Sequence, residues 1–365
     1  MKVCHVTSSH SRYDGRIFQK ECVSLSKKYD VTLLCSDLLN DEINHNVKIK
    51  SIGVDNKSRI NRFFIIPGKI SKEAIKIDAD VYHIHDPELI SLVGLLKKKG
   101  KKVVFDSHED NVNRIDDRTW IPKMIKPIFK KMYSYKERKN LMKADAVITV
   151  AKHIYDRLVK INKNTFIVTN FPLLQDVKML AKTKKKIICF AGGVEEKYMH
   201  HNIISSLYDL DVEYYVAGPY SKNYYDRLSK LEQFKKVKLL GKISKEECNK
   251  LYLKSYLGVV LIDYVPNIDY KNGSMGITKI FEYMQYGLPV VATNLEVWKD
   301  IVPNKCGICV NPNNVEEIHN AIKYLIDNPQ EASKMGKTGQ KLVKEKYNWD
   351  TQEVILFNIY KELEK

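Results

Sequence analysis

NGSMGITKIFEYMQYGLPVVATN, residues 272–294, reads as a glycine-bearing loop, a short helix and a buried strand. Gly273 and Gly276 let the backbone approach a ligand closely, and Thr278 is placed to cap the helix. The free amides of a first helical turn favour an anion. A Gly-Leu-Pro turn then ends the helix before a strand over residues 290–293. This order of elements predicts a phosphate-binding turn in an α/β fold.

Two charged residues of this helix point to the kind of phosphate. Lys279 and Glu282 are three residues apart and therefore share one helical face. A cation near the phosphates and a carboxylate one turn deeper suit a nucleotide diphosphate, because a ribose offers vicinal hydroxyls to a carboxylate acceptor. The alternative is an ordinary amphipathic helix followed by a core strand.

KIFEYMQYGLPVVAT, residues 279–293, resembles the donor-site helix of the retaining GT-B glycosyltransferases, family 4 in particular. Glu282 matches the second glutamate of that family's E-x7-E motif, whereas Ser274 stands at the first. The resemblance implies two doubly wound, Rossmann-like parallel-sheet domains facing a cleft. It also implies retaining, metal-independent transfer of a sugar from a nucleotide sugar, here a UDP-sugar, to an acceptor hydroxyl, with Glu282 holding the ribose.

Length and composition limit the number of domains and the kinds of partner that the protein can have. A chain of 365 residues predicts two domains. No apolar run approaches the roughly 18 residues of a membrane span, and the charged start lacks a signal-peptide core, so we expect a cytoplasmic protein. The net charge of +17 requires acidic partners, such as phosphorylated ligands, anionic lipid or nucleic acid. The seven cysteines are scattered, and Cys306 and Cys309 are expected to be buried free thiols.

The N-terminal residues predict a β-α-β opening, with a strand over 2–7, a helix over 17–28 and a strand over 31–35. They lack the G-x-G-x-x-G motif, which argues against a nucleotide in this half. The pattern H-x3-D-x-R-I-x3-E, residues 10–21, resembles the first loop and helix of many family 4 members. In that fold the loop faces the cleft, so Gly15 and Arg16 become candidates for phosphate or acceptor contact. The alternative is a solvated loop arginine.

Imidazoles and carboxylates follow two further predicted strands, over 81–85 and 103–106, at the sheet edge where open α/β folds bind ligands. They are His83, His85, Asp86, His108, Glu109 and Asp110. A metal site is one interpretation, but we expect none, because the groups come as adjacent pairs without a helical H-x3-H. The resemblance implies that His108 approaches the donor sugar. His85 either orients the loop or is a core histidine, and Glu109 is a further acceptor candidate.

The second half repeats the strand and helix alternation. We place a first domain at 1–172, a lysine-rich linker at 173–186 and a second domain at 187–349. The resemblance implies that the tail, 350–365, crosses back onto the first domain. Gly192 and Gly193 end a strand and form a second backbone cradle for phosphate. In the family a basic residue here neutralises the diphosphate, and Lys197 would supply that charge.

The resemblance carries a set of site residues onto this chain. The catalytic candidates are His108, Lys197, Lys279 and Glu282. The donor-binding candidates are Gly192, Gly193, Gly218, Lys242, Ile243, Ser274, Met275, Gly276, Ile277 and Thr278. Ser244 and Glu247 independently predict a capping box for the helix that follows the turn at 241–243.

Residues 120–143, WIPKMIKPIFKKMYSYKERKNLMK, carry eight basic residues and a single acidic one. Apolar residues recur among the lysines near helical spacing, with Pro122 and Pro127 expected to reset the helix. Such a face suits an anionic bilayer. The alternative is a helix whose apolar side packs on the first domain. Because similar enzymes act on lipid-linked acceptors, we expect a lipid-linked glycan acceptor and peripheral binding at the inner face of the cell membrane.

Two other functions stay open at this point. Sugar-nucleotide 2-epimerases share the architecture and would convert their nucleotide sugar without an acceptor. A basic nucleic-acid-binding protein is the non-enzymatic alternative. We expect no nucleic-acid partner, because no RRM, KH or zinc pattern is present and the lysines lack interleaved aromatic residues.

Overall fold

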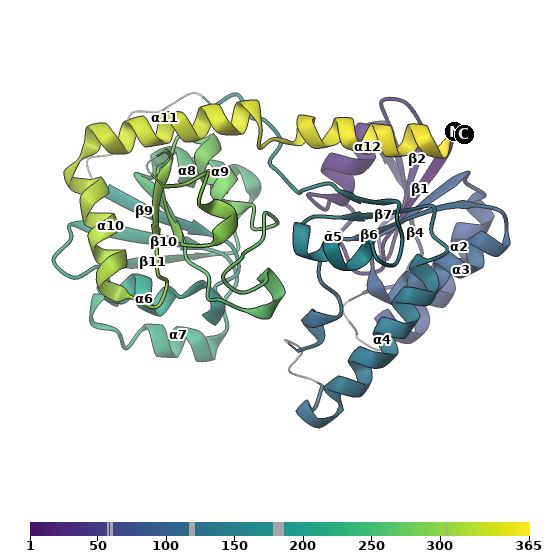
Figure 1. Cartoon of the computed structure of the whole chain (residues 1–365), viewed down its shortest axis with the longest axis horizontal. Coiled ribbons are helices and arrows are strands. Elements are labelled where there is room, and N and C mark those ends of the chain that lie inside the picture. Colours follow the sequence, from purple (N-terminus) through teal and green to yellow (C-terminus); the bar gives the residue numbers. More distant parts are fainter. Residues whose placement is uncertain (57, 59–60, 117–120, 178–185, 304) are drawn as a thin grey trace. The chain divides into compact units, whose positions relative to one another are not determined.

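The computed structural model describes residues 1–56, 58, 61–116, 121–177, 186–303 and 305–365 (Figure 1). The chain forms two compact units. Unit 1 comprises Met1–Asn170 and Trp349–Lys365, and unit 2 comprises Phe171–Asn348. Each is an α/β unit around a mainly parallel sheet, which confirms the predicted fold class. Of the expected linker, residues 178–185 lie outside the described residues.

Unit 1 contains an eight-stranded sheet of order β3-β4-β2-β1-β5-β6-β7-β8. Its strands are β1 (Lys2–Val6), β2 (Asp30–Cys35), β3 (Glu42–Asn44), β4 (Val47–Ser51), β5 (Val81–Ile84), β6 (Lys102–Ser107), β7 (Ala146–Thr149) and β8 (Thr165–Ile167). All neighbours are parallel except β3 and β4. The edge strand β3 was not predicted, because its three residues carry no hydrophobic pattern.

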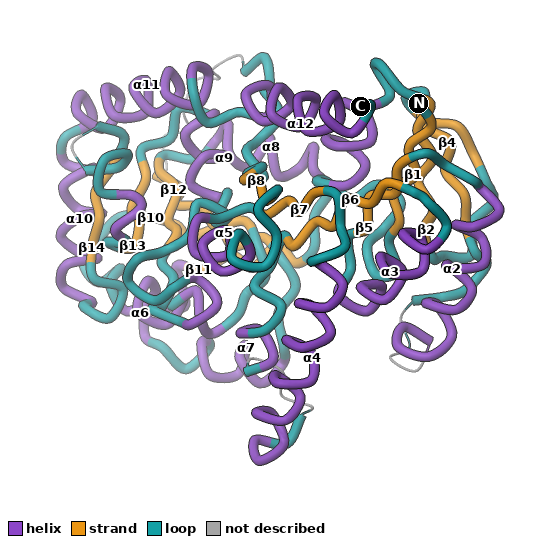
Figure 2. Tube along the Cα trace, turned by 45° about the vertical axis from the view of Figure 1, so that its right-hand side comes forward, coloured by secondary structure: helices purple, strands orange, loops and turns teal. Residues whose placement is uncertain are grey.

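The helices of unit 1 cover both faces of this sheet (Figure 2). They are α1 (Val23–Leu25), α2 (Ile66–Ile77), α3 (Ile90–Lys98), α4 (Lys126–Leu141), α5 (Lys152–Leu158) and α12 (Trp349–Leu363). Helices α2, α3 and α5 bury Ile70, Val93 and Ile154 in one core. Helix α12 packs beside α1, where Trp349 Nε1 donates to Ser24 Oγ at 2.8 Å.

Short helical turns connect these elements. The 3-10 turns are η3 (Pro87–Leu89), η4 (Asn113–Ile115) and η5 (Lys123–Ile125), and the π-helical turns are η1 (Ile17–Cys22) and η2 (Asn61–Ile65). The prediction of a single α-helix over 17–28 is therefore wrong, because the segment consists of the π-helical turn η1 followed by the one-turn helix α1. The wider π turn, in which Glu21 N donates to Arg16 O at 3.0 Å, stacks residues five apart and lets these two side chains pair.

Unit 2 contains a fully parallel six-stranded sheet of order β11-β10-β9-β12-β13-β14. Its strands are β9 (Lys186–Ala191), β10 (Val212–Ala217), β11 (Val237–Gly241), β12 (Leu257–Val260), β13 (Val290–Thr293) and β14 (Gly307–Val310). Its α-helices are α6 (His200–Ser205), α7 (Lys222–Leu228), α8 (Lys245–Lys254), α9 (Lys279–Gln285), α10 (Val315–Asp327) and α11 (Pro329–Glu345). Its 3-10 turns are η6 (Glu196–Tyr198), η7 (Glu232–Lys236), η8 (Pro266–Ile268) and η9 (Glu296–Trp298).

Two hydrophobic cores lie on opposite faces of the unit 2 sheet. Successive residues of β9 point to opposite sides, so Phe190 joins one core and Cys189 the other. Because both faces are covered, the strands read as near-continuous apolar runs, which is why the sequence predicts them closely. All seven cysteines are free. Among the described helices, none combines the length and apolarity needed to cross a membrane.

Candidate active site

A pocket of about 360 Å³ opens at the carboxyl ends of the strands of unit 2. It is lined by Ala191, Gly192, Gly193, Ala217, Gly218, Pro219, Lys242, Ile243, Ser244, Lys245, Cys248, Tyr252 and Glu282. Six sequence-predicted site residues, Gly192, Gly193, Gly218, Lys242, Ile243 and Glu282, therefore come together. This edge of a parallel sheet is where open α/β folds bind ligands.

Two glycines of this pocket stand where a Cβ atom would meet a close neighbour, which is backbone at Gly218 and a lysine side chain at Gly192. A Cβ at Gly218 would lie 1.7 Å from the Gly192 carbonyl oxygen, so a side chain there would push the two turns apart. A Cβ at Gly192 would lie 2.2 Å from Lys279 Cε. The glycine at 192 thus leaves space for the Lys279 side chain to lie across the turn. The two predicted phosphate-binding turns, one at residues 192–193 and one before α9, are therefore neighbours.

Lys279 presents a charge that no carboxylate of the described residues neutralises. Its Nζ lies 3.3 Å from Tyr198 Oη and 4.7 Å from the centre of the same ring. Within the described part of the chain, no ion pair is found for it. Lys197, whose Nζ lies 5.3 Å from the centre of the Tyr198 ring, instead pairs with Glu195 at 2.8 Å. Lys279 is therefore the better placed of the two lysines to meet an anionic ligand.

The loop before α9 departs from the sequence expectation at Thr278. This residue occupies the N-cap position, but its side chain makes no capping hydrogen bond, because its backbone is already helical (φ −79°, ψ −12°). The capping role predicted for it is wrong. Ser274 is buried, and its Oγ accepts a hydrogen bond from the Gly276 amide at 3.1 Å.

None of the five predicted donor residues from 274 to 278 lines the pocket. Ile277 belongs to the hydrophobic core, and Met275 packs against that core. Ser274 holds the turn that precedes α9, with the Ile277 amide donating to its carbonyl oxygen at 3.2 Å. In this loop the side chains thus shape the backbone and do not reach into the pocket.

Glu282 is held by a residue that the sequence reading missed. Its Oε2 accepts a hydrogen bond from the hydroxyl of buried Tyr252 at 2.8 Å and lies 3.8 Å from Lys245 Nζ. Burial, together with the charge of Glu282, raises the pKa of Tyr252 well above its usual value, so it stays a donor. The predicted capping box of Ser244 and Glu247 is confirmed, and it fixes the helix that brings Lys245 and Tyr252 here.

A second, smaller cavity of about 200 Å³ lies within unit 1. It is lined by Ser9, His10, Arg62, His85, Asp86, Pro87, His108, Glu109, Asn111 and Arg114. Predicted residues His85, His108 and Glu109 thus share one polar cavity. Gly15 is not part of it, and a Cβ at Gly15 would meet no atom within 4 Å.

The charges around this cavity are paired. His10 Nδ1 lies 3.1 Å from Asp86 Oδ1, and Arg114 pairs with Glu109. Burial acts to lower the pKa of His10, but the hydrogen bond and charge of Asp86 raise it overall. Burial lowers the pKa of His108 to about 4, so this imidazole is neutral at pH 7.

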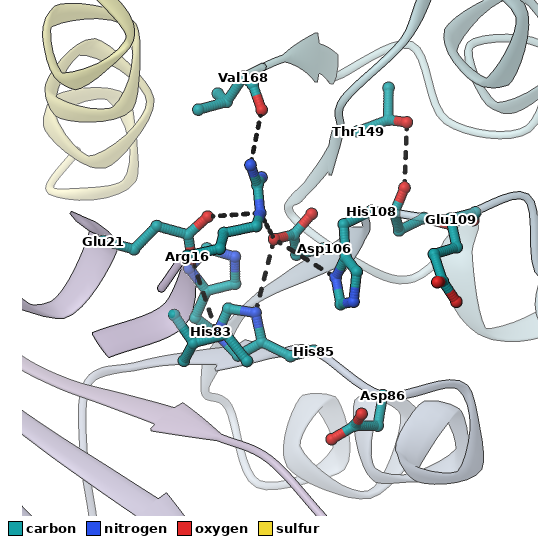
Figure 3. A network of polar contacts seen from close by, with 12 residues as sticks. Arg16, Glu21, His83, His85, Asp86, Asp106, His108, Glu109, Thr149 and Val168 are labelled. Atoms are coloured by element: carbon teal, nitrogen blue, oxygen red, sulfur yellow. Dashed lines mark hydrogen bonds and ion pairs between the residues drawn. The ribbon is translucent and has the colours of Figure 1, made fainter. Parts of the chain in front are cut away.

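Arg16 lies in the interior of unit 1, at the centre of a polar network (Figure 3). Its Nε donates to Asp106 Oδ2 at 2.8 Å and lies 3.0 Å from Glu21 Oε1, and Nη1 donates to the Val168 carbonyl at 2.9 Å. The alternative of a solvated loop arginine is therefore wrong, and the enclosure of Arg16 in this network argues against the predicted contact with a phosphate or acceptor. Nothing in the loop pattern revealed that Asp106 would face it.

His85 is a core histidine. Its Nε2 lies 2.9 Å from His5 Nδ1, and its Nδ1 lies 3.5 Å from Asp106 Oδ2. The neighbouring His83 contacts the Tyr360 hydroxyl through Nδ1 at 3.0 Å. His5 and His83 face each other in register on β1 and β5. The sequence placed His83 and His85 at a strand end but gave no sign that His5 and Glu21 would join them.

The basic segment forms η5 and α4, and Trp120 lies outside the described residues. Pro127 stands in the first turn of α4, as expected for a proline that resets the helix. Glu137, Asn140 and Leu141 are its buried residues. An exposed apolar stripe runs from Met124 of η5 to Ile128, Met132 and Tyr135 on the opposite face of α4. The alternative in which the apolar side packs on the first domain is therefore wrong.

Comparison with known families gives two matches that together span most of the chain. The family model described as "Glycosyl transferases group 1" matches residues 174–342, and the model "Glycosyltransferase Family 4" matches residues 22–170. The search of curated proteins gives no significant match.

Solved structures with this fold cover nearly the whole chain. The sucrose-phosphate synthase of Thermosynechococcus elongatus aligns with a TM-score of 0.77 and 13% identity, over 99% of this chain and 98% of that one. Anabaena HepE in complex with UDP-glucose gives 0.71 and 13%, over 99% and 100%. WaaG, a glycosyltransferase involved in lipopolysaccharide biosynthesis, gives 0.72 and 11%, over 98% and 99%. At these identities the likeness establishes the fold.

Proposed function

Because the chain belongs to the family 4 group of GT-B glycosyltransferases, we propose that it transfers a sugar from a UDP-sugar to an acceptor hydroxyl, with retention at the anomeric carbon. The observation that carries this proposal is that Glu282 lines the pocket of unit 2, while Lys279 on the same helix lies against Gly192 in the pocket wall. Lys279 has no carboxylate partner in the described residues.

Each of the two residues has a distinct task in the proposed reaction. When the bond between the anomeric carbon and the diphosphate breaks, negative charge develops on the leaving phosphate. A fixed ammonium at Lys279 stabilises that charge, since it is in place before the reaction. Glu282, oriented by Tyr252, accepts hydrogen bonds from the ribose hydroxyls. Uridine as the base is supported by the fold shared with HepE, which was solved with UDP-glucose.

We propose that no metal ion assists the leaving diphosphate. Lys279, with Lys197 nearby, supplies the positive charge that a divalent cation provides in other transferases. His108 is proposed to act on the donor sugar as a neutral imidazole, because burial lowers its pKa to about 4.

The proposed acceptor is a lipid-linked glycan, met at the inner face of the cell membrane during cell-surface polysaccharide assembly. Support comes from α4, which extends away from the sheet of unit 1 (Figures 1 and 2). Met124 of the preceding turn η5 is 91% exposed, Ile128 and Met132 of α4 continue the apolar stripe, and Lys131 and Lys136 lie exposed on α4. Apolar groups flanked by lysines suit an anionic bilayer surface, where each basic residue contributes about 1 kcal/mol.

The direct test is to incubate the purified protein with a panel of UDP-sugars, with and without a membrane lipid extract, and to measure released UDP. We expect one donor to release UDP in an extract-dependent manner, with the sugar recovered in the lipid fraction. Conversion of a UDP-sugar into its epimer without extract would assign the 2-epimerase activity instead. A lack of UDP release and of donor binding across the panel would contradict the proposal.

A further inference from the structure

The interior of unit 1 gathers three imidazoles and a carboxylate from three separate elements. His5 comes from β1, Glu21 from η1, and His83 and His85 from β5 and the residue after it. All four side chains are at most 1% exposed. Figure 3 shows Glu21, His83 and His85 converging beside Arg16 and Asp106. Each of the four offers one ligand atom, and these atoms all lie within 4.8 Å of one another.

Three of these atoms have the spacing of a metal coordination sphere. His5 Nδ1 lies 2.9 Å from His85 Nε2, and Glu21 Oε2 lies 4.0 Å from the first and 3.8 Å from the second. An ion in the plane of these three atoms would lie about 2.1 Å from each, and tetrahedral binding requires the two imidazole nitrogens to separate from 2.9 Å to about 3.4 Å. Zinc binds histidine nitrogen at about 2.0–2.1 Å and carboxylate oxygen at about 2.0–2.2 Å.

We propose that His5 Nδ1, His85 Nε2 and Glu21 Oε2 bind a divalent transition-metal ion of the zinc class, with His83 as the fourth ligand. The Nδ1 atom of His83 contacts the Tyr360 hydroxyl at 3.0 Å, which leaves Nε2 for the ion. Three imidazoles and one carboxylate are a donor set that suits zinc better than magnesium or calcium, which prefer oxygen ligands. Four protein ligands and full burial make the site structural rather than catalytic.

The surrounding residues orient these ligands as an outer shell does in metal sites. His85 turns its other ring nitrogen toward Asp106 Oδ2 at 3.5 Å, the carboxylate–histidine–metal arrangement. Asp106 is fixed in turn by the Arg16 Nε donor at 2.8 Å. The same Arg16 nitrogen lies 3.0 Å from Glu21 Oε1, so Oε2 is the oxygen of Glu21 left for an ion.

Two of the four proposed ligand atoms are buried side-chain atoms without a hydrogen-bond partner in the described structure. They are Glu21 Oε2 and His83 Nε2. A buried polar atom left unsatisfied costs about 1–3 kcal/mol, so such atoms need an explanation. A bound ion supplies the missing partner to both atoms. A hydrogen bond between His5 and His85 also explains their 2.9 Å separation, but it satisfies neither of these two atoms.

A second possible set, His85, Asp106 and His108, is the weaker candidate. It uses the same His85 through its other nitrogen, and its Asp106 Oδ2 already accepts from Arg16. The site with Glu21 therefore takes the ion, and Asp106 supports it. This metal would brace β1, η1 and β5 inside unit 1. The proposal does not concern the diphosphate and does not depend on sugar transfer.

The test uses the full-length protein, produced in medium supplemented with zinc or with cobalt, and then desalted. We expect about one ion per chain to be retained, because a closed site forms with the fold. Cobalt should give the visible absorption of a four-coordinate ion bound by nitrogen and oxygen. Absence of a retained ion, or near-ultraviolet bands from cobalt bound to cysteine thiolate, would overturn the proposal.

Two variants locate the ion without removing a core side chain. Glu21→Gln keeps the size of the side chain and an acceptor for Arg16, and it should weaken metal retention at least about tenfold. His45→Ala, at an exposed histidine of unit 1, is the matched control and should retain as much metal as the unchanged protein. Equal retention by all three proteins would place the ion elsewhere and refute the assignment, as would a thermal stability that zinc does not raise.

Discussion

The pocket of unit 2 and the buried network of unit 1 both lie toward the carboxyl ends of parallel strands, yet they hold charge in different ways. In unit 2, Lys279 lies against Gly192 of the pocket wall and has no carboxylate partner in the described residues. In unit 1, Arg16 is enclosed and shared by Asp106 and Glu21. Position at a strand end thus marks where a ligand can bind, whereas pairing and burial decide whether a given charge can meet it.

The strongest way to break this comparison is Arg16→Ala. If Arg16 is structural, its loss leaves two buried carboxylates without their cation and should lower the free energy of unfolding by about 3–5 kcal/mol. Urea denaturation measures this change. Arg138→Ala, at an exposed arginine of α4, should change the free energy of unfolding by less than about 0.5 kcal/mol. A stable Arg16→Ala protein with weakened acceptor use would restore the ligand-contact role.

Lys279→Ala tests the other side of the comparison. We expect turnover to fall about 100-fold, the effect of removing one preorganised charge stabiliser, while the protein stays folded. Steady-state kinetics with the identified donor give the measurement. Lys323→Ala, at an exposed lysine of α10, is the control and should keep normal turnover. Unchanged kinetics of Lys279→Ala would show that this unpaired charge has no catalytic use.

The lysines of α4 test whether charges of unit 1 can also meet a ligand, because some of them are exposed where Arg16 is buried. Lys126 and Lys130 contact Asp116, whereas Lys131 and Lys136 face solvent. Lys131→Ala with Lys136→Ala should weaken sedimentation with anionic vesicles about 30-fold, from about 1 kcal/mol per basic residue. Raised salt should release the unchanged protein. Binding of equal strength to neutral vesicles would rule out the electrostatic part of the proposal.

A smaller effect is expected from the carboxylate of the unit 2 pocket. Glu282→Gln should weaken UDP binding about tenfold, a loss of about 1.4 kcal/mol, with less change in turnover than Lys279→Ala. Tyr252→Phe should weaken binding by a lesser factor, since it only frees the carboxylate. Titration calorimetry of both single variants and the double variant measures their coupling. Strictly additive losses would mean that Tyr252 does not orient Glu282.

The smallest expected effect is that of chelation on turnover. If Lys279 replaces a metal at the diphosphate, activity should survive EDTA. Loss of activity that magnesium or manganese restores would show that a cation assists the leaving group after all. Restoration by zinc alone would instead point to the buried site of unit 1.

The sequence predicts the unit 2 pocket well because its signals are local. Gly192 and Gly193 follow their strand directly, and Lys279 and Glu282 share one helical turn. The buried network depends on partners far apart in the chain, such as Arg16 and Asp106, which are 90 positions apart. A loop motif specifies neither the partner of an arginine nor whether that arginine points inward.

Helix α4 illustrates another physical reason for the remaining differences. Periodicity identifies an apolar face, but it does not say whether that face meets the domain or the solvent. Here the packed side includes Glu137, which pairs with Arg157, while Met124 and Met132 are exposed. The position of Arg157 beside Glu137 in the folded unit decides which face of α4 packs against the domain.

The return of α12 to unit 1 has a consequence for the order of folding. Tyr360 is fully buried against His83, and Gln352 accepts from the Thr169 amide at 2.8 Å, so unit 1 needs residues from both ends of the described chain. Unit 2 is continuous and can close its core while the polypeptide is still being made. The residues of Met1–Asn170 therefore leave the ribosome before unit 2, but their unit is completed after it.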